Sequence, residues 1–411
     1  MRGQALIPAS KSHTIRALFF AALADGVSTI KNPLDSADGR SAFTAVKAMG
    51  AKTQILPGAW RVTGFGGKPI VPDGPVDVGN SGTTARFALS MASLCDKPVT
   101  ITGDEQTRSR PMWPLLDALK NLGAKTEGTN GKLPATVCGP LLGGSTKVDG
   151  TSSQYLSSLL IHTPLAVNGS VIILDSLNEK PYAEMTLRWL ERFGIEYKRD
   201  GYNRFEIKGG QRYKAFDDQI PGDFSSATFF ACIGAIPGNE ITLLGLDFND
   251  SQGDKAAFDY LKAMGASVTM GEGSVTVRGG KLKGANLDLN ATPDALPAMA
   301  ALAALAEGTT TLGNVPQARI KETDRIAVMA TELGKMGIRC DQTPDSLIIH
   351  GGRPKGAVVT SHGDHRVVMS LALLASASEG ETVIERAEAV EVTFPDFAEL
   401  FGQCGGMINT I

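Results

Sequence analysis

One short cluster of charged residues has the composition of a site for a small anion. Lys321-Glu322-Thr323-Asp324-Arg325 places a Lys and an Arg one helical turn apart, with carboxylates between them. Such cations can hold a phosphate or carboxylate, and Glu322 can keep a carboxyl group near the ligand for proton transfer. Alone, the cluster could also be a solvated helix start stabilised by ion pairs between neighbouring turns.

Basic side chains recur in similar settings along the chain. Arg110 lies in Arg108-Ser109-Arg110-Pro111, Arg366 follows Asp364-His365, and Lys11 and Arg16 lie near the N-terminus. The net charge of the whole chain is −3, so these basic positions are local features. The planar guanidinium suits two-point contacts with carboxylates and phosphates, so these residues predict a small polyanionic ligand.

Hydroxyl groups and a carboxylate extend this set. Ser152-Ser153-Gln154 offers hydroxyl and backbone donors that could cradle a phosphate, or a plain N-cap. Asp294 follows Pro293 and could likewise be an N-cap, or a base beside a substrate hydroxyl.

Two other patterns do not lead to a cofactor site. His362, Asp364 and His365 are close in sequence, but their spacing fits no standard metal site. The glycine-rich GFGGKP at 64–69 lacks the Walker spacing and is expected to be a turn. We expect neither a metal nor a cofactor.

The elements that carry these residues repeat about every seventy residues. Apolar helices are expected to open near six positions, with steps of 70, 71, 72, 69 and 71 residues: Ser12, Gly82, Ser153, Ser225, Asp294 and His365. Repeats of this kind must stack to bury their apolar faces. Helix N-termini attract anions, so six of them facing one cleft would form an anion-binding chamber.

The apolar patterns predict where helices and sheets lie. The opening helices, such as 227–236, are apolar all round and should be buried, whereas the second helix of each repeat has a one-sided apolar stripe. Sheets must then lie outside the helices, an inside-out α/β arrangement. A chain of 411 residues suggests two domains of three repeats each.

The last repeat is short. From His365 to Ile411 it has 47 residues, and the 11 residues before Ser12 bring it to 58, roughly a strand less than the period. We expect the two chain ends to complete one domain together, and the shortfall hints that an N-terminal strand is missing or was never encoded.

Composition limits the class of protein and its partners. The chain is 42% hydrophobic and 20% charged, which is typical of a soluble globular protein, and its acidic balance argues against a nucleic-acid partner. No apolar stretch approaches the ~20 residues of a membrane span, and no signal sequence is apparent. Five scattered cysteines without a CxxC motif suit reduced thiols. We therefore expect a cytoplasmic protein without a membrane partner, and a monomer.

The motifs together resemble a known enzyme family. PASKS (8–12), GNSGT (79–83), RPM (110–112), KETDR (321–325), DHR (364–366) and FPDF (394–397) are similar, in this order, to motifs of 5-enolpyruvylshikimate-3-phosphate synthases. The resemblance implies six βαβαββ units in two domains, 10–220 and 1–9 plus 221–411, with the active site between them. It also implies phosphoenolpyruvate and shikimate 3-phosphate as substrates, in the pathway to chorismate and the aromatic amino acids.

The resemblance also implies a role for individual residues. Its acceptor site, for shikimate 3-phosphate, would comprise Lys11, Ser12, Arg16, Ser152, Ser153, Gln154, Tyr182, Asp294, Gln317 and Lys321. Its donor site, for phosphoenolpyruvate, would comprise Lys11, Asn80, Gly82, Arg110, Gln154, Arg325 and Arg366. Glu322 would protonate C3 of phosphoenolpyruvate, and Asp294 with Lys11 would take the hydroxyl proton.

Three positions depart from the family pattern. Glu179 stands where many members have a Ser that contacts the acceptor phosphate, and its carboxylate would repel a phosphate unless Lys180 or another cation neutralises it. Gln317 replaces a common Asn, and Val392 replaces a Lys found in one branch. Val392 together with Phe87, where glyphosate-sensitive members often have Pro, predicts weak glyphosate binding.

Other functions stay open on the sequence alone. The related transferases that act on UDP-N-acetylglucosamine usually carry a reactive Cys in the loop before Arg-Pro, and 104–110 has none. Another phosphorylated alcohol could be the acceptor, for which Glu179 is the best hint. A non-catalytic anion-binding repeat protein is disfavoured because carboxylates such as Glu322 and Asp294 weaken anion binding.

Overall fold

The computed structural model describes residues 1–409, and its internal contacts divide the chain into two compact units. One unit is Ala9–Ile220, and the other combines Met1–Pro8 with Pro221–Ile411. The sequence-based boundary at residue 10 differs from this division by one residue.

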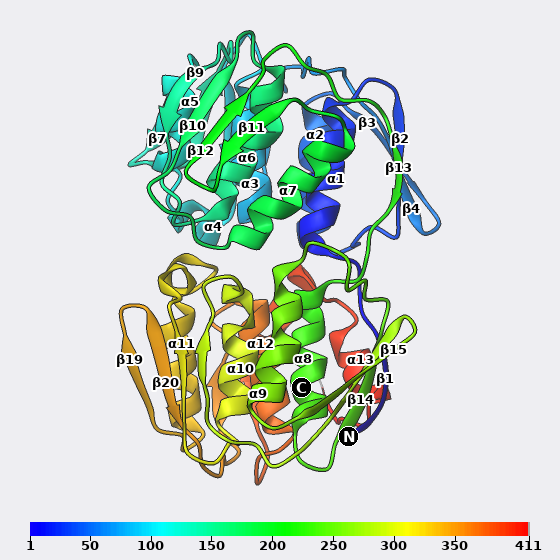
Figure 1. Cartoon of the computed structure of the whole chain (residues 1–411), viewed down its shortest axis with the longest axis vertical. Coiled ribbons are helices and arrows are strands. Elements are labelled where there is room, and N and C mark those ends of the chain that lie inside the picture. The colour runs from blue at the N-terminus through cyan, green and yellow to red at the C-terminus, as the bar shows by residue number, and fades with distance from the viewer. Residues whose placement is uncertain (410–411) are drawn as a thin grey trace. The chain divides into compact units, whose positions relative to one another are not determined.

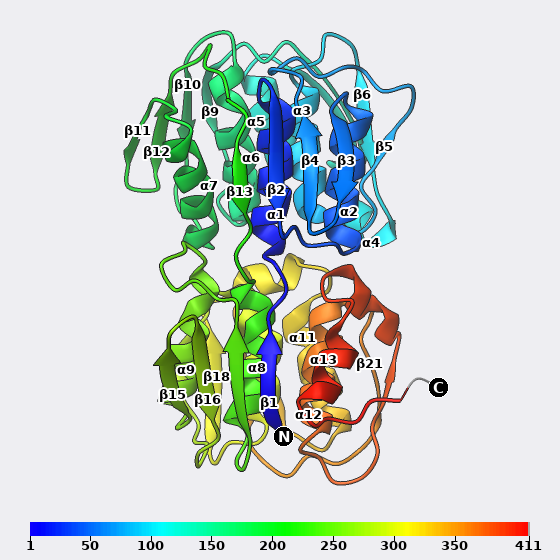
Figure 2. The same cartoon turned by 90° about the vertical axis from the view of Figure 1, so that its right-hand side faces the viewer.

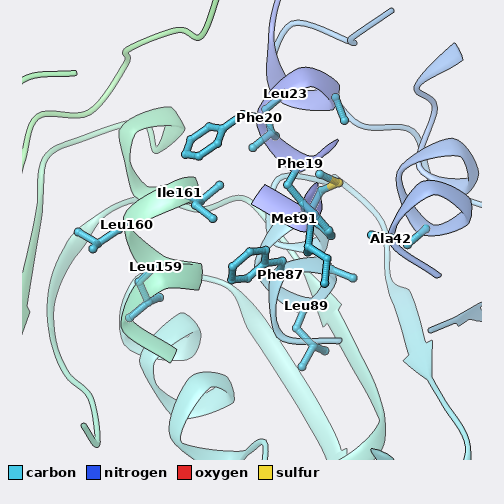
Figure 3. Packing of buried hydrophobic residues seen from close by; sticks show 14 of the residues in the cluster. Phe19, Phe20, Leu23, Ala42, Phe87, Leu89, Met91, Leu159, Leu160 and Ile161 are labelled. Carbon is cyan, nitrogen blue, oxygen red and sulfur yellow. The ribbon is translucent and has the colours of Figure 1, made fainter. Parts of the chain in front are cut away.

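In the Ala9–Ile220 unit, three buried helices form the centre. They are α1 (Lys11–Leu23), α3 (Gly82–Ala92) and α6 (Ser153–His162). Phe19 of α1 packs edge-on against Phe87 of α3, with 5.3 Å between ring centroids. Figure 3 shows this pair beside the apolar residues of α6. A helix that is apolar on all sides is stable only in such an interior, because every face then loses contact with water.

Three four-stranded sheets with one topology surround these helices. Their strand orders are β13-β2-β4-β3, β5-β6-β8-β7 and β9-β10-β12-β11. In each sheet the first two strands are parallel and the last three are antiparallel neighbours. Figure 2 shows the strands of the first of these sheets side by side in front of α1. The strands are β2 (Val27–Lys31), β3 (Lys52–Leu56), β4 (Ala59–Thr63), β5 (Val76–Asp77), β6 (Val99–Thr102), β7 (Lys125–Thr129), β8 (Lys132–Cys138), β9 (Gly144–Lys147), β10 (Ser170–Ile173), β11 (Tyr197–Asp200), β12 (Arg204–Ile207) and β13 (Asp217–Gln219).

The second unit repeats this plan. Its buried helices are α8 (Phe224–Ala235), α10 (Leu296–Ala303) and α12 (His365–Ala375), and Figure 1 shows them between strands on either side. Its sheets have the orders β1-β14-β16-β15, β17-β18-β20-β19 and β21-β22. The strands are β1 (Arg2–Leu6), β14 (Glu240–Leu244), β15 (Ser267–Gly271), β16 (Ser274–Arg278), β17 (Asn286–Asp288), β18 (Thr309–Gly313), β19 (Cys340–Thr343), β20 (Ser346–His350), β21 (Val358–Thr360) and β22 (Val383–Glu385).

The remaining helices are the more amphipathic ones and the short connecting turns. The α-helices are α2 (Ala37–Ala48), α4 (Glu105–Ser109), α5 (Trp113–Asn121), α7 (Lys180–Arg192), α9 (Ala257–Ala263), α11 (Arg325–Lys335) and α13 (Phe397–Gln403). The 3-10 turns are η1 (Thr163–Leu165), η2 (Gly253–Ala256), η3 (Pro293–Ala295), η4 (Pro316–Ile320) and η5 (Ala387–Val392).

The predicted inside-out architecture is present, and five of the six opening helices begin within one residue of the predicted position. The fifth differs, because η3 (Pro293–Ala295) precedes α10 and carries Asp294. The hint of a missing N-terminal strand stays a prediction, and the first strand present, β1, pairs in parallel with β14. The shortfall lies in the sheet of the last repeat, which has only β21 and β22 among residues 1–409. Over the same residues, no helix is long and apolar enough to cross a membrane.

Candidate functional site

The two units cap their buried helices differently. In Ala9–Ile220 the cap side chains of α1, α3 and α6 are Ser10, Ser81 and Ser152, which each accept a backbone N–H bond. In the other unit, α8 and α12 are capped by Asp223 and Asp364. A serine cap adds no charge to the positive end of its helix, whereas a carboxylate cap opposes that charge. By their caps, the serine-capped helices are therefore the more favourable for anion binding at their starts.

At the start of α1, Lys11 is paired with a carboxylate. Its Nζ lies 3.1 Å from Oδ2 of Asp38, which is in the first turn of α2. The pair is mostly buried, with 14% of the Lys11 side chain and 7% of the Asp38 side chain exposed. Asp38 orients the ammonium, and no sequence motif pointed to it.

Arg16 connects Ser12 with Tyr182. Its guanidinium donates to the carbonyl oxygens of Ser12 (3.0 Å) and Tyr182 (2.9 Å), to Thr186 Oγ1 (2.8 Å) and to Ser157 Oγ (3.2 Å). Burial lowers the pKa of this guanidinium to about 10. These bonds make Arg16 a support for Ser12 and Tyr182.

Near the start of α3, two guanidinium groups approach one glycine. A Cβ atom on Gly82 would lie 2.4 Å from Nη1 of Arg110 and 2.9 Å from Nη1 of Arg86. Both arginines are buried. Asn80, just before the helix, donates from Nδ2 to Asp104 Oδ2 (2.7 Å) and Gln106 Oε1 (2.6 Å). The structure thus brings predicted donor-site residues Asn80, Gly82 and Arg110 to one helix start.

The start of α6 carries the predicted phosphate cradle. Ser152 Oγ accepts from the Gln154 backbone N–H at 3.4 Å. Ser153 donates from its backbone nitrogen (3.2 Å) and from Oγ (2.8 Å) to Oε2 of Glu179, which is 1% exposed. The carboxylate that was expected to repel a phosphate therefore already accepts bonds from the Ser153 donors. Lys180 is exposed, and its Nζ lies 5.4 Å from the centroid of the Tyr202 ring.

Gln154 is held by Arg86. Nη1 of Arg86 donates to Oε1 of Gln154 at 2.8 Å and to the Gly82 carbonyl oxygen at 2.9 Å. Arg86 lies next to the GNSGT motif, but the sequence did not predict this contact, because the two residues are 68 positions apart.

In the second unit, Asp294 lies among three cations. Its carboxylate oxygens lie 2.8 Å from Arg325 Nη1, 3.0 Å from Arg366 Nη2 and 3.8 Å from Lys321 Nζ. The carboxylate side chain remains 15% exposed. Residues from three separate segments of the chain thus form one cluster of basic side chains around a carboxylate.

Arg325 is the centre of this cluster. Besides Asp294 it contacts Glu322 Oε2 through Nη2 (2.6 Å) and Asp364 Oδ2 through Nε (2.8 Å). Burial alone would lower the pKa of this guanidinium, but the charges of Asp364, Glu322 and Asp294 outweigh it and raise the pKa. Burial likewise opposes ionisation of Asp364, but Arg325 lowers the pKa of that carboxyl below its ordinary value. The guanidinium stays charged and separates Asp294 from Glu322.

Three further predicted positions have distinct surroundings. Arg366 donates from Nη2 to Ser225 Oγ at 2.9 Å, which links the starts of α12 and α8. Gln317 is fully buried and donates from Nε2 to the Asn290 carbonyl oxygen at 2.9 Å, and its Oε1 accepts no hydrogen bond from residues 1–409. Val392 ends η5 and is partly buried. Over the same described range, no group of three or more His, Cys, Asp or Glu could hold a metal ion.

The fold and its two groups of basic residues define a class of protein: an inside-out α/β protein of repeated units with basic side chains at its helix starts. One group is Arg86 with Arg110, and the other surrounds Asp294. The model of the EPSP synthase (3-phosphoshikimate 1-carboxyvinyltransferase) family matches residues 1–401. The chain therefore belongs to the EPSP synthase family.

Individual relatives agree with this membership. A protein of Acetivibrio thermocellus named 3-phosphoshikimate 1-carboxyvinyltransferase is 52% identical over 410 residues, 99% of this chain and 97% of the relative. One of the same name from Ruminiclostridium cellulolyticum is 47% identical, covering 100% of this chain and 97% of its own length. The solved structure of EPSP synthase from Acinetobacter baumannii has a TM-score of 0.83 at 29% identity, covering 99% of this chain and 96% of that one. The predicted fold is thereby confirmed.

Proposed function

We propose that this protein transfers the enolpyruvyl group of phosphoenolpyruvate to the 5-hydroxyl of shikimate 3-phosphate and releases phosphate. The family match over almost the whole chain supports this reaction. The observation that carries it is the position of Asp294 between Arg325, Arg366 and Lys321. Cations of this kind bind two anionic substrates, and a carboxylate among them is suited to accept a proton.

The acceptor, shikimate 3-phosphate, is held mainly through its phosphate. Ser152 and Ser153 offer hydroxyl and backbone donors at the start of α6, and Lys321 adds a charge. Ser12, Tyr182 and Gln317 line the ring, and Arg16 supports the first two of these from behind. Gln154 contacts both substrates.

The donor, phosphoenolpyruvate, is held by the arginines. Its binding residues are Lys11, the Asn80–Gly82 turn, Arg110, Arg325 and Arg366. Phosphate and carboxylate groups match the fork of each guanidinium.

The reaction is an addition followed by an elimination. The 5-hydroxyl oxygen attacks C2 of phosphoenolpyruvate, Asp294 with Lys11 takes the hydroxyl proton, and C3 gains a proton from Glu322. The tetrahedral adduct then loses a proton from C3 and phosphate from C2. Arg325 contacts both carboxylates: its Nη1 lies against Asp294, the proton acceptor, and its Nη2 lies against Glu322, the proton donor.

Charge stabilisation supplies the rest of the catalysis. Negative charge collects on the departing phosphate, and cations already fixed by protein contacts stabilise it without reorganising. Each such contact contributes on the order of 3 kcal/mol to lowering the barrier.

The experiment that tests this function measures phosphate release from phosphoenolpyruvate with three acceptors in parallel: shikimate 3-phosphate, shikimate and UDP-N-acetylglucosamine. Rapid release only with shikimate 3-phosphate supports the proposal. Release with UDP-N-acetylglucosamine instead, or no release from folded protein with any acceptor, contradicts it.

We extend the proposal to a monomeric cytoplasmic enzyme without a nucleic-acid partner. Light scattering of the purified protein tests the first point, and fractionation of the native cells tests the second.

A further inference from the structure

The hydrogen-bond donors of Ser153 bind a carboxylate of the protein itself. The backbone N–H and the hydroxyl of Ser153 both donate to Oε2 of Glu179, at 3.2 Å and 2.8 Å. Each of these two residues is 1% exposed. This contact joins the start of α6 to a residue 26 positions later in the chain.

The backbone of Glu179 is unusual for its residue type. Its φ of 55° and ψ of 38° lie in the left-handed region, which glutamate rarely adopts. Glu179 immediately precedes α7, yet its side chain makes no capping bond to that helix. The carboxylate instead accepts hydrogen bonds from Ser153 at the start of α6. Non-glycine residues in this region concentrate at functional sites, where the surrounding structure holds them.

The start of α6 does not need this carboxylate as a cap. Ser152 already accepts the N–H of Gln154, as an N-cap residue does. Glu179 therefore occupies the next set of donors, those that the proposed function assigns to the acceptor phosphate. A carboxylate and a phosphate cannot both be held by the same two donors, because they compete for the hydrogens and repel each other.

We propose that Glu179 sets the affinity for the acceptor: its carboxylate occupies the Ser153 donors in the free protein and is displaced by the acceptor phosphate. This inference rests on the proposed function. When only a fraction of the protein has the donors available, the apparent dissociation constant rises by the inverse of that fraction. Glu179 therefore weakens binding of shikimate 3-phosphate and leaves binding of phosphoenolpyruvate unaffected.

The test is calorimetric titration of shikimate 3-phosphate into the wild-type protein and into E179Q and E179N, without phosphoenolpyruvate. Gln removes the charge at nearly constant shape, and Asn also tolerates the left-handed backbone, so E179N is expected to fold. We expect both variants to bind at least about tenfold more tightly than wild type, with the KM for phosphoenolpyruvate within about twofold.

The matched control is E184Q. Glu184 is a carboxylate within α7, but it accepts a hydrogen bond from the Tyr202 hydroxyl at 2.6 Å and pairs with Arg199 instead of contacting the start of α6. Its removal should leave the dissociation constant unchanged, so an equal gain in E184Q would attribute the effect to net charge and overturn the proposal.

A double-mutant cycle with S153A adds a second test. In wild type, loss of the Ser153 hydroxyl weakens the hold on both competitors, so its effects partly cancel. In E179N only the phosphate loses a donor, so S153A should weaken binding more in E179N than in wild type.

Equal or weaker binding by E179Q and E179N would overturn the inference, because Glu179 would then support the site. That result leaves the proposed function intact if the wild-type protein turns over shikimate 3-phosphate. Failure of that turnover contradicts the function itself.

Discussion

Nη1 of Arg86 lies 2.8 Å from Oε1 of Gln154 and 2.9 Å from the carbonyl oxygen of Gly82. One buried guanidinium thus joins the start of α3, a predicted donor-binding element, to the side chain expected between the two substrates. Because Oε1 accepts from Arg86, the two N–H groups of the Gln154 amide are the ones available to ligands. Arg86 also lies 5.2 Å from the centroid of the Tyr155 ring.

Replacing Arg86 should therefore affect binding through Gln154. We expect R86Q to lower kcat/KM by about 10- to 100-fold, mostly by raising KM for both substrates. R86K should recover part of the loss, since Lys can reach one of the two oxygens. A Q154A/R86Q double variant that loses no more than either single variant would support this coupling. Additive losses, or a loss of thermal stability alone, would contradict it.

Adding one methyl group at Gly82 should displace two arginines. The new Cβ would lie 2.4 Å from Arg110 Nη1 and 2.9 Å from Arg86 Nη1, both at the ends of flexible side chains, so the protein should fold. We expect G82A to raise the KM for phosphoenolpyruvate by about tenfold, roughly the effect of one misplaced charged contact. G74A is the control, because within residues 1–409 no atom other than those of Gly74 and its two chain neighbours lies within 4 Å of the position that a Cβ on Gly74 would take. An unchanged KM in G82A would show that Arg110 does not bind the donor.

Removing the carboxylate of Asp294 should slow the chemical step. We expect D294N to lower kcat by about 10²- to 10⁴-fold, the usual contribution of general acid–base catalysis, while the protein still binds shikimate 3-phosphate. D341N is the control, since Asp341 is an exposed carboxylate of the same unit. Near-normal turnover by D294N in steady-state phosphate release would exclude Asp294 as the proton acceptor.

We expect the free energy of unfolding to decrease as the pH is lowered, because of His162. This side chain is fully buried in α6, and burial lowers its pKa from 6.5 to about 4. Between these values the unfolded chain binds a proton that the folded protein does not, so the free energy of unfolding falls as pH decreases from 6.5 to 4. A shift of this size corresponds to about 3 kcal/mol at the lower end.

H162N removes this titration and keeps a donor near the Ser158 carbonyl oxygen, which lies 2.8 Å from Nδ1 of His162. Denaturant unfolding between about pH 4 and pH 7 should therefore show a shallower pH dependence in H162N than in wild type. Parallel curves would mean that other groups determine the acid sensitivity.

Weak inhibition by glyphosate stays a prediction. Phe87 is fully buried and lies against Phe19, with the Arg16 guanidinium 5.6 Å from its ring centroid. Competitive inhibition against phosphoenolpyruvate measures it, and a submicromolar inhibition constant would refute it.

The residue pattern was sufficient to predict the architecture because burial acts on local periodicity. Helices such as Phe224–Ala235 are apolar on all faces, and their spacing of about seventy residues required similar units to stack with sheets outside. The helix start at the fifth position differs because Pro293 begins the 3-10 turn η3, and α10 starts only at Leu296, with Pro297 in its first turn.

The sequence by itself determined the repeat, the helix starts and the kinds of residues at them, since these depend on neighbours within a few turns. Only the tertiary structure decided the partners: Asp38 for Lys11, Arg86 for Gln154, and Asp294, Glu322 and Asp364 around Arg325. It also decided that Glu179 accepts bonds from Ser153. The sequence contains several carboxylates that could pair with each of these cations. Which one does so depends on which carboxylate the fold places within about 3 Å of the cation.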